Sequence, residues 1–221
     1  MNIKNIRGLK YPDEYFIKFF FKYNLHNKSN QKYLELGCSN GCNLMLPYQF
    51  DNDIIGVDLN KSLIDFANYN FNQLDTNNSY SYVCEDMRKF CQNETNINTD
   101  VLVLANSIYY IPKNDFINLL KNIKNKNLIK TNIPFFIRFR LPNDFRNNKG
   151  KVIEKNSIII DNGITGEDGA FCKFYEIDEM TNILKEELNL KDFQTMEITY
   201  ENIQNNTKVK NYEAVIWGTV N

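Results

Sequence analysis

The sequence contains 221 residues with a mass of 26.1 kDa, which suits one large domain with its own hydrophobic core. Apolar residues make up 43% and charged residues 24%, a balance that excludes a disordered or collagen-like chain. The net charge of -1 gives no positive field for nucleic acid or an anionic membrane. No apolar run approaches the roughly 20 residues of a membrane helix. We therefore expect a single cytoplasmic domain over residues 1–221, with no nucleic acid or membrane as partner and an oligomeric state that the sequence does not define.

The cysteines and the histidine argue against a disulfide framework and against a metal site. The five cysteines are an odd number and form no C-x-x-C pair, and the single histidine is His26. Catalysis by a histidine base would have only His26 available. We expect no bound metal and no histidine-dependent hydrolase.

Helices and strands are predicted to alternate along the chain. The first helix starts near Asp13, and further helices are expected after Gly41, distorted near Pro47, and over residues 61–72, 116–123 and 177–188. Strands are expected over residues 32–36, 54–57, 80–83, 100–105, 135–140, 193–200 and 212–220, with a polar turn over 202–210 between the last two. This order predicts an α/β, Rossmann-like, doubly wound sheet of seven mostly parallel strands with an antiparallel C-terminal hairpin.

Residues 141–170 interrupt the alternation. They are rich in glycine, asparagine and charged residues, and one short strand over 152–160 is the regular structure expected in them. We therefore expect an insertion here.

Small or polar residues follow each of the first four predicted strands. A turn rich in small residues covers 37–41, Asp58 follows the second strand, 85–87 follow the third, and 106–107 follow the fourth. Ligands of open α/β sheets bind beyond the carboxyl ends of the strands, so these segments should meet around one ligand. Asp58 is placed to accept hydrogen bonds from a ribose diol.

The order of these motifs resembles that of the class I S-adenosylmethionine (SAM)-dependent methyltransferases. YLELGCSNG matches the first motif of that family, an acid followed by small residues at alternate positions, with Ser39 where glycine is commonest. The resemblance implies that Glu35 binds the amino end of the methionine moiety, Asp58 binds the ribose hydroxyls, and Asp86 with the Met87 backbone binds adenine. The implied cofactor is SAM, and its implied binding residues are Glu35, Gly37, Ser39, Gly41, Asp58, Leu59, Asp86, Met87 and Asn106.

Each motif also has an ordinary structural explanation. A glycine turn after a strand occurs in many doubly wound proteins, Asp58 is suited to cap the next helix, and Asp86 is suited to a solvated loop. Cys38 and Cys42 fit buried small residues better than redox partners. The ordered set of motifs favours a cofactor site more strongly than any single motif does.

Other motifs fit less well. Residues 37–41 spell G-x-S-x-G, the nucleophile elbow of α/β-hydrolases, but no histidine follows Ser39 in the chain. The nicotinamide-binding fingerprint G-x-G-x-x-G would fall on positions 37, 39 and 42, where this sequence has Gly, Ser and Cys. That fingerprint also gives Glu35 no role. The Asn/Asp-Pro-Pro-Tyr/Phe motif of DNA and RNA amino-methyltransferases is absent after the fourth strand.

The arginines indicate an anionic small-molecule substrate. Only five of the 26 basic residues are arginine, yet Arg138, Arg140 and Arg146 fall within nine residues. Strand alternation places Arg138 and Arg140 on one face, and guanidinium groups suit two-pronged recognition of carboxylate or phosphate. The alternative is that the arginines pair within the protein, with Asp144, Glu167 or Asp168.

The segment GLKYPDEYF and the arginine-rich insertion resemble small bacterial methyltransferases of capsule or surface-glycan precursors, including those that O-methylate capsular phosphoramidate. This resemblance implies a helical lid over residues 1–30 and a substrate-side insertion over 141–170. The implied substrate-binding residues are Tyr11, Arg138, Arg140 and Arg146. A phosphoryl oxygen needs little help from a base, whereas a sugar hydroxyl needs one, for which the candidates are Tyr109, Asp144 and Glu167.

We therefore predict SAM-dependent O-methylation of a small anionic or glycan-precursor acceptor, a phosphoramidate, phosphate or sugar derivative. Two alternatives stay open: a small-molecule N-methyltransferase, and a SAM-binding protein without catalysis. The aromatic side chains of the first helix, Phe16, Phe19 and Phe20, fit core packing at least as well as a lid.

Overall fold

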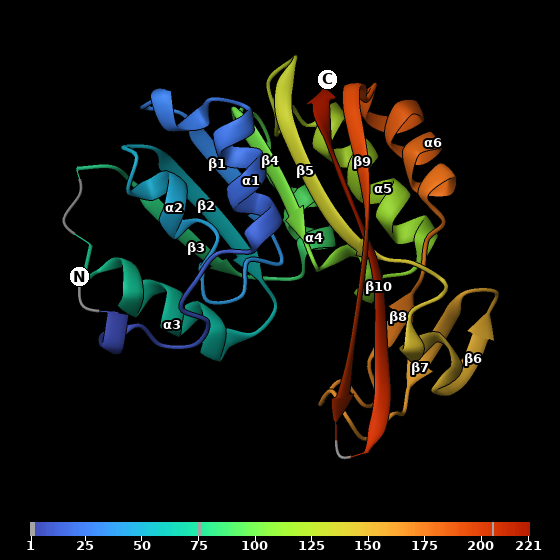
Figure 1. The fold of residues 1–221 in the computed structure, drawn as a ribbon. Coiled ribbons are helices and arrows are strands. Elements are labelled where there is room, and N and C mark those ends of the chain that lie inside the picture. The colour runs from blue at the N-terminus through green and yellow to red at the C-terminus, as the bar shows by residue number, and fades with distance from the viewer. Residues whose placement is uncertain (1–2, 75–76, 205) are drawn as a thin grey trace.

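The computed structural model describes residues 3–74, 77–204 and 206–221. Its centre is a seven-stranded sheet in the order β3-β2-β1-β4-β5-β10-β9 (Figure 1). β10 pairs antiparallel with β5 and β9, and the other pairs of neighbouring strands are parallel, so the predicted parallel sheet with an antiparallel C-terminal hairpin is confirmed. The strands are β1 (Lys32–Leu36), β2 (Asp53–Asp58), β3 (Tyr80–Cys84), β4 (Val101–Ala105), β5 (Ile133–Arg140), β9 (Lys191–Gln204) and β10 (Thr207–Val220).

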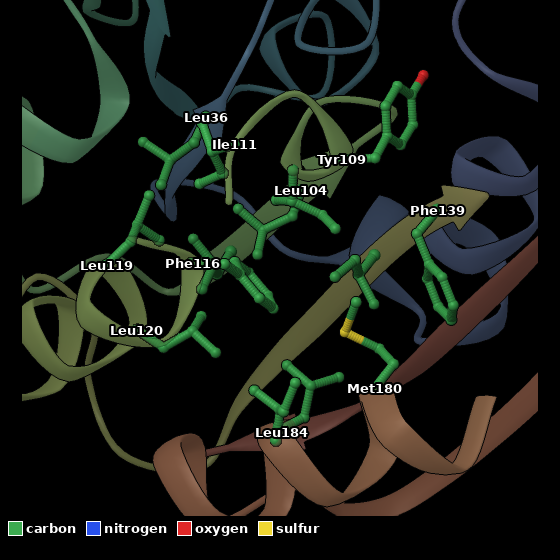
Figure 2. Close-up of a cluster of buried hydrophobic side chains, with 14 of the residues drawn as sticks. Leu36, Leu104, Tyr109, Ile111, Phe116, Leu119, Leu120, Phe139, Met180 and Leu184 are labelled. Atoms are coloured by element: carbon green, nitrogen blue, oxygen red, sulfur yellow. The ribbon is translucent and has the colours of Figure 1, made fainter. Parts of the chain in front are cut away.

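Helices cover both faces of this sheet, as a mostly parallel sheet requires. They are α1 (Glu14–Lys22), α2 (Met45–Tyr48), α3 (Lys61–Phe71), α4 (Met87–Asn93), α5 (Lys113–Asn125) and α6 (Ile177–Leu188). One hydrophobic cluster joins the sheet to α1, α2 and α3, and the other joins it to α4, α5 and α6. Figure 2 shows part of the second cluster, where side chains of β1, β4 and β5 meet those of α5 and α6.

Strand alternation explains how the sheet supplies both clusters. Leu102 and Leu104 of β4 belong to the cluster with α5 and α6, whereas Val101 and Val103 belong to the cluster with α1. Successive side chains of a strand point to opposite faces, and a strand covered on both sides is apolar throughout. Every residue of β4 is buried.

Helix α4 was not predicted from the sequence. It has seven residues, of which Phe90 and Cys91 are buried, so it is too short to show a helical period. The sequence nevertheless contains a signal for the start of α4, because Asp86 is a favourable capping residue. Its side chain accepts a hydrogen bond from the Arg88 amide.

The prediction of a single strand over residues 152–160 is wrong. The chain forms a hairpin of β6 (Gly150–Glu154) and β7 (Ser157–Ile160), because Asn156 adopts a left-handed conformation with φ of 57° and reverses its direction. A third strand, β8 (Phe171–Lys173), completes a small antiparallel sheet beside the main one (Figure 1).

The prediction of a polar turn over residues 202–210 is also wrong, because most of these residues lie in the paired strands β9 and β10. Their register pairs Glu201 with Lys210 and Asn202 with Val209. The ribbon extends beyond the other strands of the main sheet (Figure 1), where its side chains are largely exposed. A pair of strands that is exposed to solvent does not need a run of apolar residues. The polar composition of residues 202–210 therefore indicated a turn rather than strands.

Candidate functional site

A cavity of about 650 Å³ opens at the carboxyl ends of β1 to β4. A smaller cavity of about 320 Å³ lies between the loop after β1 and the segment before α1. Gly37, Ser39 and Asn106 line both cavities. The structure therefore brings the residues of the four strand-end motifs together, as the sheet topology requires.

The loop after β1 forms the wall between the cavities. Gly37 and Gly41 have φ of +82° and +75°, and Ser39 has φ of 52°, so the backbone turns through the left-handed region three times. A Cβ atom on Gly37 would lie 2.2 Å from the Ser107 Cβ. The glycine is therefore required both by conformation and by close packing.

Asp58 stands at the end of β2 and organises this loop. Its Oδ2 accepts a hydrogen bond from the Ser39 amide at 2.8 Å, and its Oδ1 accepts one from the Asn60 amide at 2.9 Å. The cap of α3 is Asn60, whose side chain accepts from the Ser62 and Leu63 amides. Asp58 is therefore not the helix cap, and its carboxylate, like neighbouring Leu59, lines the larger cavity.

Glu35 is the buried acid of the smaller cavity. It is 1% exposed, and its Oε1 accepts a hydrogen bond from Asn43 Nδ2 at 2.6 Å. The other oxygen, Oε2, is buried and has no hydrogen-bond partner among the described residues. Burial raises the pKa of Glu35 to about 8, against the lowering effect of Asn43. A buried carboxylate of this kind lacks a cation, and an ammonium group in the cavity would satisfy it.

Asp86 and Met87 line the far end of the larger cavity. Asp86 accepts hydrogen bonds from the Arg88 guanidinium, which lower its pKa and keep it ionised. Met87 is the first residue of α4, where backbone N–H groups have no partner within the helix. The pair thus offers an acceptor and a donor close together, the pattern that the edge of an adenine ring requires.

Asn106 follows β4 in a left-handed conformation with φ of 57°. Its Nδ2 donates to Asp13 Oδ2 at 3.2 Å, and Asp13 also caps α1 through the Tyr15 and Phe16 amides. Asn43 Oδ1 accepts from the Asp13 amide at 2.8 Å. The segment before α1 is therefore bound to the site itself.

That segment, rather than α1, borders the smaller cavity. Leu9 and Tyr11 line it, and Tyr11 is 71% exposed. Three aromatic residues of α1 are instead fully buried against the sheet, namely Phe16, Phe19 and Phe20. Within the expected lid of residues 1–30, the part beside the cavity is thus the segment before the helix.

The three clustered arginines are all paired with carboxylates. Arg138 contacts Asp13 and Glu213. Arg140 Nη2 lies 2.5 Å from Glu167 Oε1, and Arg146 Nε lies 2.7 Å from Glu167 Oε2. Arg146 also pairs with Asp144 at 3.0 Å. Of the internal partners considered from the sequence, Asp144 and Glu167 are present, whereas Asp168 accepts from the Asn162 and Gly163 amides.

The three candidate bases are engaged as well. Tyr109 is buried, which raises its pKa well above the usual value of a phenol. Burial would raise the pKa of Glu167, but Arg140 and hydrogen bonds from Tyr110 and Arg140 lower it to about 2. Asp144 is fully buried and accepts from the Arg146 and Tyr212 amides. Near neutral pH Tyr109 keeps its proton and Glu167 is a weak base, so neither is suited to accept a proton from an acceptor, and both oxygens of Asp144 already accept backbone hydrogen bonds.

Three residues of the site did not emerge from the sequence as site residues. Asn43 bonds to Glu35, Asp13 bonds to Asn106, and Tyr110 lines the larger cavity while its hydroxyl donates to Glu167. Asn43 stands two residues after Gly41, so its position beside the first motif was the available signal. Among the described residues, no group of three His, Cys, Asp or Glu side chains is arranged to hold a metal. No helix in the same parts of the chain is long and apolar enough to cross a membrane.

The strand order and the cavity at the ends of β1 to β4 define the class I methyltransferase fold. Residues 34–126 match the family model described as "Methyltransferase domain". The matched domain and the Rossmann-like fold together support a SAM-dependent methyltransferase with SAM as its cofactor.

Solved structures share this fold at low sequence identity. A SAM-dependent methyltransferase from Methanosarcina mazei aligns with a TM-score of 0.64 at 13% identity, covering 90% of this chain and 98% of its own. One from Clostridium acetobutylicum aligns with a TM-score of 0.62 at 16% identity, covering 92% and 90%. A Synechocystis magnesium protoporphyrin IX methyltransferase with bound SAM aligns at 0.54 and 13% identity, covering 92% and 76%. No curated protein matches the sequence.

Proposed function

We propose that the protein methylates an oxygen of a small anionic or glycan-precursor acceptor, a phosphoramidate, phosphate or sugar derivative. The observation that supports cofactor binding best concerns Glu35, which lines a cavity beside the strand ends and whose buried Oε2 has no partner among the described residues. We assign Glu35 to the ammonium group of the methionine moiety, Asp58 to the ribose hydroxyls, and Asp86 with Met87 to adenine. Gly37, Ser39, Gly41, Leu59 and Asn106 complete the cofactor residues that we propose.

SAM supplies a methyl group on a positively charged sulfur. Bound SAM would give up this methyl group to the acceptor oxygen, and the electron pair of the broken carbon–sulfur bond would stay on sulfur. The protein's task is therefore to hold the acceptor in line and to exclude water. We assign the exclusion of water to the segment of Leu9 and Tyr11 on one side, and to Ala170 at the end of the insertion and Phe171 of β8 on the other.

The three candidate bases are buried or already paired, and this favours an acceptor that needs no base. A phosphoryl oxygen is already anionic, so its methylation releases no proton. A sugar hydroxyl must lose one, and Tyr109, Asp144 and Glu167 are each buried or bound to arginine. We therefore favour an anionic oxygen, the acceptor chemistry of the capsule-precursor enzymes that the sequence resembles.

The first test of this proposal is calorimetry with S-adenosylhomocysteine, the product of methyl transfer. We expect one site per chain. A folded protein that shows no binding would contradict the proposal.

The second test is transfer of a labelled methyl group to phosphorylated, phosphoramidate, sugar-nucleotide and amine acceptors. Labelling of an oxygen is expected, and labelling of an amine alone would favour the N-methyltransferase alternative. Cofactor binding without transfer to any acceptor of the panel would favour the non-catalytic alternative.

The Asp58→Asn variant is expected to weaken S-adenosylhomocysteine binding by about tenfold, the cost of one charged hydrogen bond. The asparagine amide also opposes one of the two backbone donors, Ser39 N or Asn60 N. Calorimetry measures the effect. The matched control is Asp65→Asn on the exposed face of α3, where the carboxylate pairs with Lys61, and the affinity of this variant should be unchanged. Equal affinities for the two variants would remove Asp58 from the cofactor site.

A further inference from the structure

Two buried arginines converge on one carboxylate at the edge of the larger cavity. Arg140 is 5% and Arg146 is 8% exposed, and they bind different oxygens of Glu167. The Tyr110 hydroxyl donates to the same carboxylate, and Tyr110 lines the cavity. The cluster therefore adjoins the space in which the cofactor and acceptor should meet.

Arg140 and Arg146 differ from Arg138 in the part of the chain that supplies their carboxylate partner. Asp13 and Glu213, the partners of Arg138, belong to the cap of α1 and to β10. Glu167 instead lies in the insertion, between β7 and β8. Arg138 thus links elements of the main fold, whereas Arg140 and Arg146 pair with a carboxylate from a loop.

This loop is attached to the rest of the protein mainly through Glu167. Within residues 162–168, the other hydrogen bonds join members of the loop and its two ends, such as those from the Asn162 and Gly163 amides to Asp168. Gly163 and Gly166 have φ of +63° and +71°, with no atom within 4 Å of where a Cβ would be. An open glycine-containing loop can move without disturbing a packed core.

The cluster also leaves one buried donor without an acceptor among the described residues. Arg140 Nη2, Arg146 Nε and the Tyr110 hydroxyl donate to the two oxygens of Glu167. Arg140 Nε is buried and has no acceptor among the described residues. A phosphoryl group has three terminal oxygens, so it provides more acceptors than a carboxylate does.

We infer that Arg140 and Arg146 form the binding site for a phosphoryl group of the methyl acceptor, and that Glu167 fills this site until the acceptor displaces it. The inference rests on the proposed methyl transfer. Exchange of one anion for another keeps the buried guanidinium groups neutralised throughout. Displacement of Glu167 would also release the loop that ends at Ala170 and Phe171, which line the cavity. Acceptor binding and access to the cavity are thereby coupled.

The test uses inorganic phosphate as the probe and does not require methyl transfer. Calorimetry with the S-adenosylhomocysteine complex should show Glu167→Gln binding phosphate about tenfold more tightly than the wild type, because the internal competitor is weakened. Acetate at equal ionic strength should bind more weakly than phosphate to the variant. Equal phosphate affinity in variant and wild type, or a preference for acetate, would overturn the inference.

The matched control is Asp168→Asn, the neighbouring carboxylate, which contacts loop amides and, within the described part of the chain, pairs with no arginine. Its phosphate affinity should stay within about twofold of the wild type, since the competitor is intact. A rise equal to that of Glu167→Gln would show that loosening of the loop, not competition, controls the site.

The wild-type protein provides a measurement that does not depend on the folding of a variant. Phosphate should accelerate amide hydrogen exchange in residues 162–168, because the loop loses its attachment through Glu167. Unchanged or slower exchange at saturating phosphate would contradict the inference. S-adenosylhomocysteine binding without any effect of phosphate would refute this inference alone, whereas failure to bind S-adenosylhomocysteine would refute the proposed function.

Discussion

Glu35→Ala is expected to weaken S-adenosylhomocysteine binding by about a hundredfold, or about 3 kcal/mol. The variant removes the carboxylate of a residue that is 1% exposed, and Oε2 of this carboxylate has no hydrogen-bond partner in the described parts of the chain, which leaves it for the expected ammonium group. A buried ion pair that loses one member leaves the other without compensation, which makes the effect large. Isothermal titration calorimetry measures it directly.

Glu35→Gln separates the charge from the shape of the side chain. The glutamine Oε1 can still accept the hydrogen bond that Asn43 donates to Glu35 at 2.6 Å. We expect this variant to fold at least as stably as the wild type near neutral pH while losing most of the affinity that Glu35→Ala loses. Wild-type affinity in Glu35→Gln would show that the carboxylate does not bind the cofactor's ammonium group.

The raised pKa of Glu35 predicts how the stability of the free protein depends on pH. The pKa is about 8 in the folded protein and 4.5 without burial, so the folded state holds the proton more tightly. The contribution of Glu35 is therefore complete below pH 4.5 and is lost as the pH rises to about 8. Thermal unfolding across this range should show a shallower decline for Glu35→Gln than for the wild type. Parallel curves would place the Glu35 pKa near its ordinary value.

Gly37→Ala is expected to destabilise the protein by about 3 kcal/mol, the sum of left-handed strain and a steric clash. The φ of +82° disfavours any side chain, and the added Cβ would lie 2.2 Å from the Ser107 Cβ. Because Ser107 donates to the Leu36 carbonyl at 2.6 Å, it is not free to move away. Denaturant unfolding monitored by circular dichroism measures the change.

The control for Gly37→Ala is Gly163→Ala. Gly163 has φ of +63° and no atom within 4 Å of the added Cβ, so this variant isolates the backbone strain at about 1 kcal/mol. Adding Ser107→Gly to Gly37→Ala should restore part of the lost stability, because it removes the atom that clashes. Equal destabilisation by both alanine variants would mean that the contact with Ser107 does not constrain the turn.

Much of the fold was predictable because its elements follow local patterns. The five residues of β1 matched the predicted strand, and α6 matched the predicted helix over 177–188. Long amphipathic helices and apolar central strands repeat a periodicity that the sequence displays. Helix α4 and the hairpin of β6 and β7 are short, so the cap at Asp86 and the turn at Asn156 were too weak as signals.

The cofactor motifs were predictable for a topological reason. Gly37, Asp58, Asp86 and Asn106 are far apart in the chain, but each follows a parallel strand, and parallel strands end at one edge of the sheet. Their convergence thus needed no knowledge of side-chain contacts. Asn43 and Asp13 were missed because their roles depend on side-chain contacts between different elements: Asn43 donates to Glu35, and Asp13 accepts from Asn106.

The sequence by itself determined the size, the near-neutral charge, the α/β alternation and the ordered motifs that resemble those of methyltransferases. It also drew attention to the arginines, since five arginines among 26 basic residues are not spread evenly. Only the tertiary structure decided what each arginine contacts, because Asp13 and Glu213 reach Arg138 from opposite ends of the chain. Such pairings depend on how distant elements pack, which no local pattern encodes. Packing likewise brought Glu167 to Arg140 and Arg146, at the edge of the cavity.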